Sequence, residues 1–291
     1  MVTRRWVTMW PFGALAAASH PVVGLARRVR RPAAHIREQA ITARTMSTTI
    51  AISGKGGSGK TTLTAMMIRH LMARGGSLLA VDADPNACLG LALGINQQKT
   101  VAELRDETLS GKLPGADANR ERAFEYGLQQ VLAESKGFDL LTMGQPEGPK
   151  CYCAVNNLLR RYLDQASSDY RWVVVDNEAG MEHLSRRTTN GVDLLLIVTE
   201  PTAVGVMTAR RILGLSERLP ITVKRRGVLW NKVTEGVPLP AGGDALPTLG
   251  RVPLDPVVLE ASMYGSTVFE LDAGRPSYVA VGRMLEEQLK G

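Results

Sequence analysis

The stretch Gly54-Lys55-Gly56-Gly57-Ser58-Gly59-Lys60-Thr61-Thr62 decides the fold of this 291-residue chain. It matches the pattern G-x-x-x-x-G-K-[ST], which is short enough to occur by chance and therefore needs the right context. Residues 48–52 provide it, because they are apolar or β-branched like a buried parallel strand and run directly into the glycines. Behind the loop, Thr61–Ala73 has the apolar spacing of a helix that stops at Gly75-Gly76. A strand, a glycine-rich loop and a helix are expected in that order.

A loop of this kind binds phosphate groups. Its glycines let backbone amides converge on one point, and the N-terminus of the following helix adds partial positive charge there. We expect Lys60 to reach the β- and γ-phosphates of a nucleotide and Thr61 to ligate Mg²⁺. A glycine-rich turn without a ligand is the weaker alternative, because strand and helix flank the loop in register. The residues expected to bind the nucleotide here are Gly54, Gly56, Gly57, Ser58, Gly59, Lys60, Thr61 and Thr62.

Strand-like and helix-like segments alternate along the rest of the chain. Such alternation predicts an α/β fold, namely a doubly wound, mostly parallel sheet with helices on both faces and ligands at the carboxyl ends of the strands. The Pro/Gly-rich stretch 237–250 is expected to be a surface loop. The other predicted strands are 78–81, 139–142, 172–175, 194–198, 228–230 and 248–252, and helical patterns cover 124–132, 203–219 and a core-packed 277–290.

Lys55 is a second lysine inside the loop, where the backbone gives little reason for one. The loop resembles that of the deviant Walker A family of MinD-like P-loop NTPases (the SIMIBI class), which includes the MinD and ParA ATPases, the nitrogenase iron protein and several metal-cofactor chaperones. The resemblance implies that Lys55 crosses the interface of a homodimer to the partner's nucleotide and neutralises charge as an arginine finger does. A solvated surface lysine is the alternative interpretation.

Two acids follow predicted strands, at the edge where a nucleotide site must lie. By the same resemblance, Asp84 would orient the attacking water, Asp176 would bind Mg²⁺ through water, and the Gly180 amide would sense the γ-phosphate. Acids that end strands also serve as helix caps, but two of them after a phosphate-binding loop favour function. The resemblance thus implies an ATPase whose catalytic residues are Lys55, Lys60, Asp84 and Asp176. It also implies an adenine site at Asn231, Lys232 and Pro253, which could otherwise be an ordinary strand-end turn.

Cys151 and Cys153 are two of only three cysteines. Thiols at positions i and i+2 of an extended backbone project the same way and can chelate one soft metal ion. A four-coordinate site would need two more thiolates, which the twofold axis of a homodimer would supply. The alternatives are incidental reduced thiols or a labile disulfide. Cys88 is expected to be a small apolar packing residue instead.

Segments 82–90, 148–160 and 176–184 restrict the resemblance to one branch of the deviant Walker A family. Together with the C-x-C pair they look like the CooC-type accessory ATPases that mature nickel-dependent carbon monoxide dehydrogenase, and the likeness covers essentially residues 46–291. It implies ATP, Mg²⁺ and Ni²⁺ or Zn²⁺ as ligands, and apo carbon monoxide dehydrogenase as the client. Two alternatives stay open: a ParA- or MinD-like partitioning or positioning ATPase, and an iron–sulfur ATP-dependent reductase.

The net charge of +7 does not indicate a nucleic-acid or membrane partner. Residues 1–46 hold eight of the 35 basic side chains and one of the 28 acidic ones, so the rest of the chain carries 27 of each. We expect residues 1–45 to be a disordered basic leader or an over-extended reading frame with Met46 as the initiator. Arg4-Arg5 and the apolar run after them imitate a secretory signal. Residues 46–291 are expected to form one cytoplasmic P-loop ATPase domain.

Overall fold

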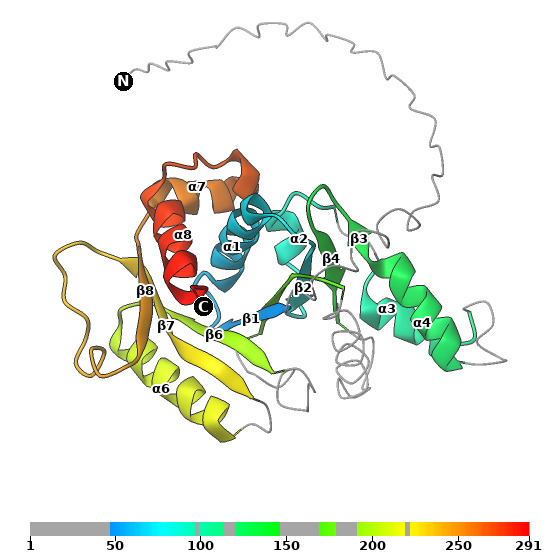
Figure 1. Cartoon of the computed structure of the whole chain (residues 1–291), viewed down its shortest axis with the longest axis horizontal. Coiled ribbons are helices and arrows are strands. Elements are labelled where there is room, and N and C mark those ends of the chain that lie inside the picture. Colours follow the sequence, from blue (N-terminus) through cyan, green and yellow to red (C-terminus); the bar gives the residue numbers. More distant parts are fainter. Residues whose placement is uncertain are drawn as a thin grey trace, which may run out of the picture. The chain divides into compact units, whose positions relative to one another are not determined.

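The structure is a computed structural model that describes residues 47–96, 99–112, 120–145, 169–178, 191–218 and 222–290. Within these residues, eight strands form one sheet in the order β3-β4-β2-β5-β1-β6-β7-β8 (Figure 1). β3 runs antiparallel to β4, and the other neighbouring pairs are parallel, as the sequence predicts. The strands are β1 (Thr48–Gly54), β2 (Leu78–Ala83), β3 (Ala133–Glu134), β4 (Asp139–Thr142), β5 (Trp172–Asn177), β6 (Val192–Thr199), β7 (Val223–Val233) and β8 (Thr248–Pro253).

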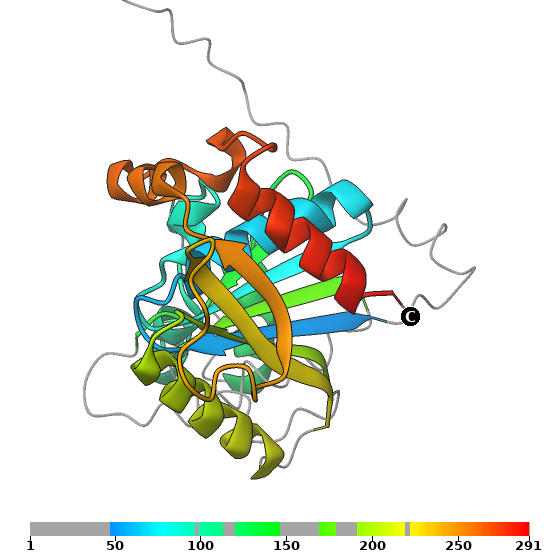
Figure 2. The same cartoon turned by 90° about the vertical axis from the view of Figure 1, so that its left-hand side faces the viewer.

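Helices cover both faces of the sheet, which is the doubly wound arrangement. Buried apolar side chains of α1, α2 and α8 pack on one face, whereas those of α3, α4 and α6 pack on the other. Figure 2 shows α8 (red) above the sheet and α6 (yellow-green) below it. The described helices are α1 (Lys60–Arg74), α2 (Leu89–Ala92), α3 (Val101–Leu109), α4 (Arg120–Val131), α6 (Ala203–Arg218), α7 (Pro256–Tyr264), α8 (Pro276–Gln288) and the 3-10 turn η1 (Val268–Glu270).

β1 and α1 confirm the strand, loop and helix expected around the glycines. Ile50 and Ile52 belong to the core that α1 covers, while Ala51 between them packs on the α6 face. α1 ends at Gly75, whose φ of +73° lies in the region that favours glycine. The apolar side chains of α1 predicted to face the core are all buried: Leu63, Met66, Met67 and Leu71.

β7 is longer than predicted. It begins at Val223 rather than Val228, and its first residues pair in parallel register with β6. Lys224 belongs to this early part and forms an ion pair with Asp193 of β6 at 2.7 Å. Because charged side chains interrupt the hydrophobic pattern here, periodicity alone does not predict a strand. The patterns also miss β3, α2, α3 and α7.

α7 contains no fully buried residue, although Val258 packs partly buried against the core. Asp255 caps its N-terminus by accepting a hydrogen bond from the Val257 N–H at 3.2 Å. The same carboxylate accepts bonds from Arg275 and, at 2.8 Å, from the hydroxyl of Ser277 in the first turn of α8. Burial raises the pKa of Asp255, but the bonds from Arg275 and Ser277 outweigh this and lower it below its usual range. An ion pair between a buried carboxylate and a partly exposed guanidinium therefore ties α7 to α8.

Replacing Arg275 with methionine is expected to destabilise the protein at pH 7, because the Asp255 carboxylate loses its charged partner. Because the pKa of Asp255 is lower in the folded than in the unfolded state, its ionised carboxylate stabilises the fold above the unfolded-state pKa near 4. This stabilisation is lost as the pH falls through the folded-state pKa. The difference between wild type and variant should therefore shrink below about pH 4. Urea unfolding across this pH range measures it, with Arg283→Met on the exposed side of α8 as the control. A pH-independent loss would contradict the ionic explanation.

Candidate nucleotide-binding site

The P-loop, residues 54–62, joins β1 to α1 at the carboxyl edge of the sheet. Gly54 and Gly59 have φ values of +152° and +88°. A Cβ on Gly54 would lie 2.1 Å from the carbonyl oxygen of Val198, and one on Gly59 would lie 2.4 Å from Nδ2 of Asn231. β6 and β7 thus pack directly against the loop, and no side chain fits at these two positions.

The carbonyl oxygen of Lys55 is the centre of the hydrogen bonds inside the loop. It accepts bonds from the backbone N–H of Ser58 at 3.2 Å, from the hydroxyl of Ser58 at 2.8 Å and from Nζ of Lys60 at 3.4 Å. Lys60 is only 7% exposed, whereas Lys55 is exposed. The two lysines of the loop therefore differ in placement, one inside the loop and one in solvent.

Asp176 is the penultimate residue of β5, lies beside the loop and is 1% exposed. Its Oδ2 accepts a hydrogen bond from the hydroxyl of Thr61 at 2.6 Å, and its Oδ1 accepts one from Thr64 at 3.4 Å. Burial raises the pKa of Asp176 to about 6, and the Thr61 bond and the Lys60 charge oppose the rise. The Thr61 hydroxyl and the buried Asp176 carboxylate offer the hard oxygen ligands that Mg²⁺ prefers. The charge of a bound Mg²⁺ would favour the ionised form of Asp176. These residues therefore fit Mg²⁺.

Asp82 lies at the end of β2, paired in register with Asp176, and Asp84 directly follows the strand. The fully buried Asp82 carboxylate accepts bonds from the backbone N–H groups of Leu89 at 2.8 Å and Asp84 at 3.2 Å. Burial raises the pKa of Asp82 to about 7, against the effect of these two bonds. Asp84 is partly exposed, and its Oδ1 accepts bonds from the backbone and side-chain nitrogens of Asn86. Asp82 thus closes the loop on which Asp84 is presented.

The residues predicted to bind adenine lie in one cavity beside the P-loop. This cavity of about 270 Å³ is lined by the loop, by Asn231, Lys232 and Pro253 at the ends of β7 and β8, and by α7. Asn231 donates from Nδ2 to the carbonyl oxygen of Ser58 at 2.8 Å, and Lys232 donates from Nζ to that of Gly57 at 3.3 Å. The structure thus brings the three residues together, while their contact with a base stays a prediction.

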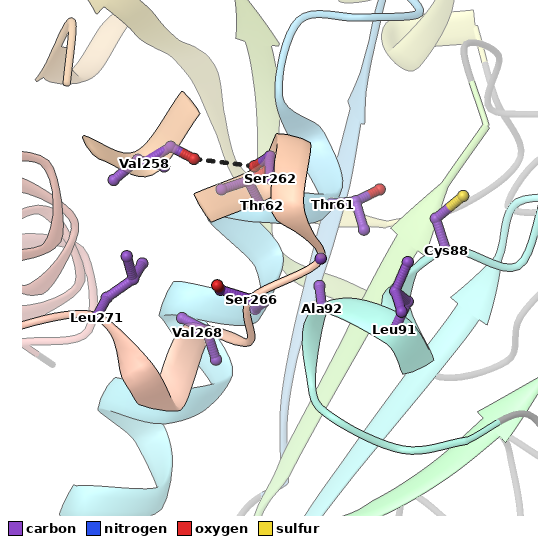
Figure 3. A pocket seen from close by; sticks show the side chains of 12 residues that line it. Thr61, Thr62, Cys88, Leu91, Ala92, Val258, Ser262, Ser266, Val268 and Leu271 are labelled. Atoms are coloured by element: carbon purple, nitrogen blue, oxygen red, sulfur yellow. Dashed lines mark hydrogen bonds between the residues drawn. The ribbon is translucent and has the colours of Figure 1, made fainter. Parts of the chain in front are cut away.

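A second cavity of about 190 Å³ adjoins the first turn of α1, α2, α7 and η1 (Figure 3). Thr61 and Thr62 line it together with Leu91 and Cys88. The expectation that Cys88 is a packing residue is wrong, because the residue is exposed. It precedes α2, and the buried position is taken by the next residue, Leu89.

Four predictions fall outside the described residues: the metal ligands Cys151 and Cys153, the γ-phosphate sensor Gly180, and the leader 1–45. In the ranges that the structure describes, no group of three or more His, Cys, Asp or Glu side chains is placed to hold a metal ion. The C-x-C metal site therefore stays a prediction.

Among the helices of the same ranges, none is long and apolar enough to cross a membrane.

A mostly parallel sheet, a glycine-rich loop between β1 and α1, and acids at the ends of β2 and β5 define a P-loop nucleotide-binding protein. The chain belongs to the CobQ/CobB/MinD/ParA nucleotide binding domain family, whose model matches residues 49–268. An uncharacterized ATP-binding protein of Methanocaldococcus jannaschii is 38% identical over 82% of this chain and 97% of its own length. The carbon monoxide dehydrogenase accessory protein CooC of Rhodospirillum rubrum is 32% identical over 76% of this chain and 89% of its own.

Solved structures show the same fold. The septum site-determining protein MinD of Pyrococcus horikoshii, complexed with Mg-ADP, superposes with a TM-score of 0.63 at 22% identity and covers 84% of this chain and 97% of its own. A ParA family ATPase of Chlorobium tepidum gives 0.62 at 18% identity, covering 82% and 97%. The solved structures therefore share the fold of this chain, and the family match makes it a nucleotide-binding protein of the MinD/ParA type.

Glu200 and Thr64 lie at the site but were not predicted there. Nζ of Lys232 lies 2.6 Å from Oε1 of Glu200. The sequence does contain a signal for Glu200, because this acid directly follows an apolar strand. Asp84 was predicted from a similar position after the strand 78–81. Thr64 follows Lys60 by one helical turn and donates to the carbonyl oxygen of Lys60 at 2.8 Å, a spacing that periodicity could have shown.

Proposed function

We propose that this protein is an ATP-dependent metallochaperone that inserts nickel into carbon monoxide dehydrogenase. The observation that supports it most is the similarity to the CooC accessory protein, which extends over most of both chains. The C-x-C pair at Cys151 and Cys153 would hold the metal cargo. Nickel, rather than zinc, rests on the family resemblance, because thiolates bind both ions readily.

The nucleotide site would bind and hydrolyse ATP. The amides of the P-loop and the buried Lys60 ammonium would hold the β- and γ-phosphates, and Thr61 with Asp176 would hold Mg²⁺, which supplies charge neutralisation when bound. Asp84, at the rim of the site, would orient the attacking water. Asp82 would support this step indirectly, because its two backbone hydrogen bonds hold the loop that carries Asp84.

A homodimer would complete the site. Lys55 is exposed although it belongs to the loop, so it is available to a second subunit. A dimer closed over two nucleotides would place each Lys55 against the partner's γ-phosphate. The same twofold axis would bring two copies of Cys151 and Cys153 together as four thiolates. If metal binds the closed dimer better, ATP and metal must each tighten the binding of the other.

Replacing Cys151 and Cys153 with serine is expected to abolish nickel binding, whereas wild type should bind about one ion per dimer. Anaerobic mass measurement of the intact protein with Ni²⁺, with and without Mg-ATP, reports the oligomer and the bound metal together. Cys88→Ser is the matched control, because it removes the exposed thiol near the nucleotide site but leaves the pair intact. An unchanged metal content in the double variant would end the hypothesis.

The client is tested separately. Nickel-loaded wild type with Mg-ATP should activate apo carbon monoxide dehydrogenase, and the double serine variant should not.

The partitioning and positioning alternative predicts instead that the ATP-bound protein binds DNA or lipid vesicles. α8 gives that alternative little support, since Tyr278, Val281, Met284 and Leu285 are buried against the sheet. We also propose that residues 46–291 form the ATPase domain in the cytoplasm.

A further inference from the structure

The end of β7 has an unusual backbone. Lys232 adopts a φ of +57°, the left-handed region that non-glycine residues avoid. In a regular strand, successive side chains point to opposite faces of the sheet. The left-handed residue interrupts this alternation, so that Asn231 and Lys232 both reach the P-loop, at the carbonyl oxygens of Ser58 and Gly57. The strained conformation thus has an identifiable result, which is two adjacent side chains on one loop.

Glu200 holds the Lys232 side chain in this position. Its Oε1 lies 2.6 Å from Nζ of Lys232, and the side chains of Lys232 and Glu200 are 40% and 37% exposed. The backbone around Glu200 is fixed, because its carbonyl oxygen accepts a hydrogen bond from the N–H of Thr202 at 2.8 Å, just before α6. In the sheet, Thr199 is paired with Trp230, so Glu200 stands beside the end of β7. A rigid strand end therefore presents the carboxylate to the ammonium.

The contacts at Gly57 and Ser58 orient the amides of the loop. Because a trans peptide is planar, its C=O and N–H point in opposite directions. Drawing the carbonyls of Gly57 and Ser58 toward β7 therefore turns the next two N–H groups, those of Ser58 and Gly59, away from it. The Ser58 N–H accordingly donates to the carbonyl oxygen of Lys55 at 3.2 Å, within the loop and not toward β7. The interior of the loop is the side on which a phosphate would be held.

We propose that Glu200 is a positioning residue for nucleotide binding, which acts through Lys232 on the Gly57 carbonyl and keeps the P-loop amides turned toward the phosphates. Glu200 itself does not touch the nucleotide. The proposal rests on the P-loop as the ATP site, and it is independent of the metal and of the client. It also gives Lys232 a role that does not require contact with a base.

The test compares Glu200→Gln, Lys232→Met and the double variant by calorimetric titration with Mg-ADP and with Mg-ATP. Each single change should weaken the binding of both nucleotides by about two- to fivefold, as expected for a half-exposed ion pair. The double variant should bind nucleotide no more weakly than the weaker-binding single variant, because Glu200 acts through Lys232. In steady-state assays of Glu200→Gln, KM should rise while kcat stays near the wild-type value, since the loop is misplaced in the ground state and saturation restores it.

The control is Glu217→Gln, which removes an exposed glutamate of α6 away from the loop. Its nucleotide affinity should equal that of wild type. The melting temperature of nucleotide-free Glu200→Gln should match that of this control, which separates positioning from global stability. Unchanged affinity in Glu200→Gln, or additive losses in the double variant, would overturn the proposal. Failure of wild type itself to bind ATP would instead refute the nucleotide site.

Discussion

ATP hydrolysis is expected to fall by about a hundred- to a thousandfold when Lys60 is replaced with methionine, the range for removing one preorganised charged donor from a reacting site. Methionine keeps most of the length and apolar stem of lysine but loses the ammonium. That ammonium lies inside the loop, 3.4 Å from the carbonyl oxygen of Lys55, so no other position in the loop replaces it. Its charge also lowers the pKa of Asp176, so the carboxylate would lose part of its electrostatic support without it.

Phosphate release at saturating Mg-ATP measures this loss, and calorimetry shows how much of it is binding. The matched control is Lys136→Met, in the exposed turn between β3 and β4, which should leave turnover unchanged. Circular dichroism should show that both variants are folded, because Lys60 belongs to none of the three apolar clusters of the core. Wild-type turnover in Lys60→Met would contradict the assignment of the loop as the phosphate site.

Replacing Lys55 with methionine is expected to lower kcat by about a thousandfold while the affinity of one subunit for ATP stays close to that of wild type. The exposed Lys55 side chain leaves the loop, so its loss should not disturb the interior bonds, which use only its carbonyl oxygen. The charge it supplies to a partner's transition state would be missing. Lys60→Met should therefore lose binding and turnover together, whereas Lys55→Met should lose turnover alone.

Mixing two inactive variants shows whether Lys55 acts in trans. A Lys55→Met subunit keeps its own Asp84, and an Asp84→Asn subunit still offers Lys55 to its partner. In their heterodimer one of the two sites is complete, so an equal mixture should recover about a quarter of wild-type turnover by random pairing. A lysine that acts within its own subunit would leave both sites broken. Absence of recovery, with heterodimers demonstrated by mass measurement, would contradict the trans role.

Local sequence predicts the P-loop region well because several short-range rules agree there. The β-branched run before Gly54, the glycines and the apolar spacing after Lys60 each indicate the same strand, loop and helix, and their carboxyl-edge position follows from the parallel topology. The acids Asp84 and Asp176 could be placed at that edge for the same reason. These features depend on neighbours in the chain or on one general rule of sheet geometry.

Other parts of the site depend on contacts between distant segments. The left-handed conformation of Lys232 cannot be predicted from its residue type, and so the sharing of one loop by Asn231 and Lys232 is not visible in the sequence. The ion pair to Glu200 joins two strand ends that only the sheet order brings together. Cys88 was misplaced for a simpler reason, since a helix as short as α2 has too little periodicity to show which residue turns inward.

The order of strands in the sheet has a consequence for synthesis. β1 is the first described strand to leave the ribosome, yet its two neighbours, β5 and β6, begin only at Trp172 and Val192. The loop that follows β1 is closed on one side by Val198 and on the other by Asn231, both of which are translated much later. Parallel pairing across such separations forms slowly, and it leaves β1 as an unpaired apolar edge meanwhile. A nucleotide is therefore expected to stabilise the nascent chain only once β7 has emerged and the loop is closed.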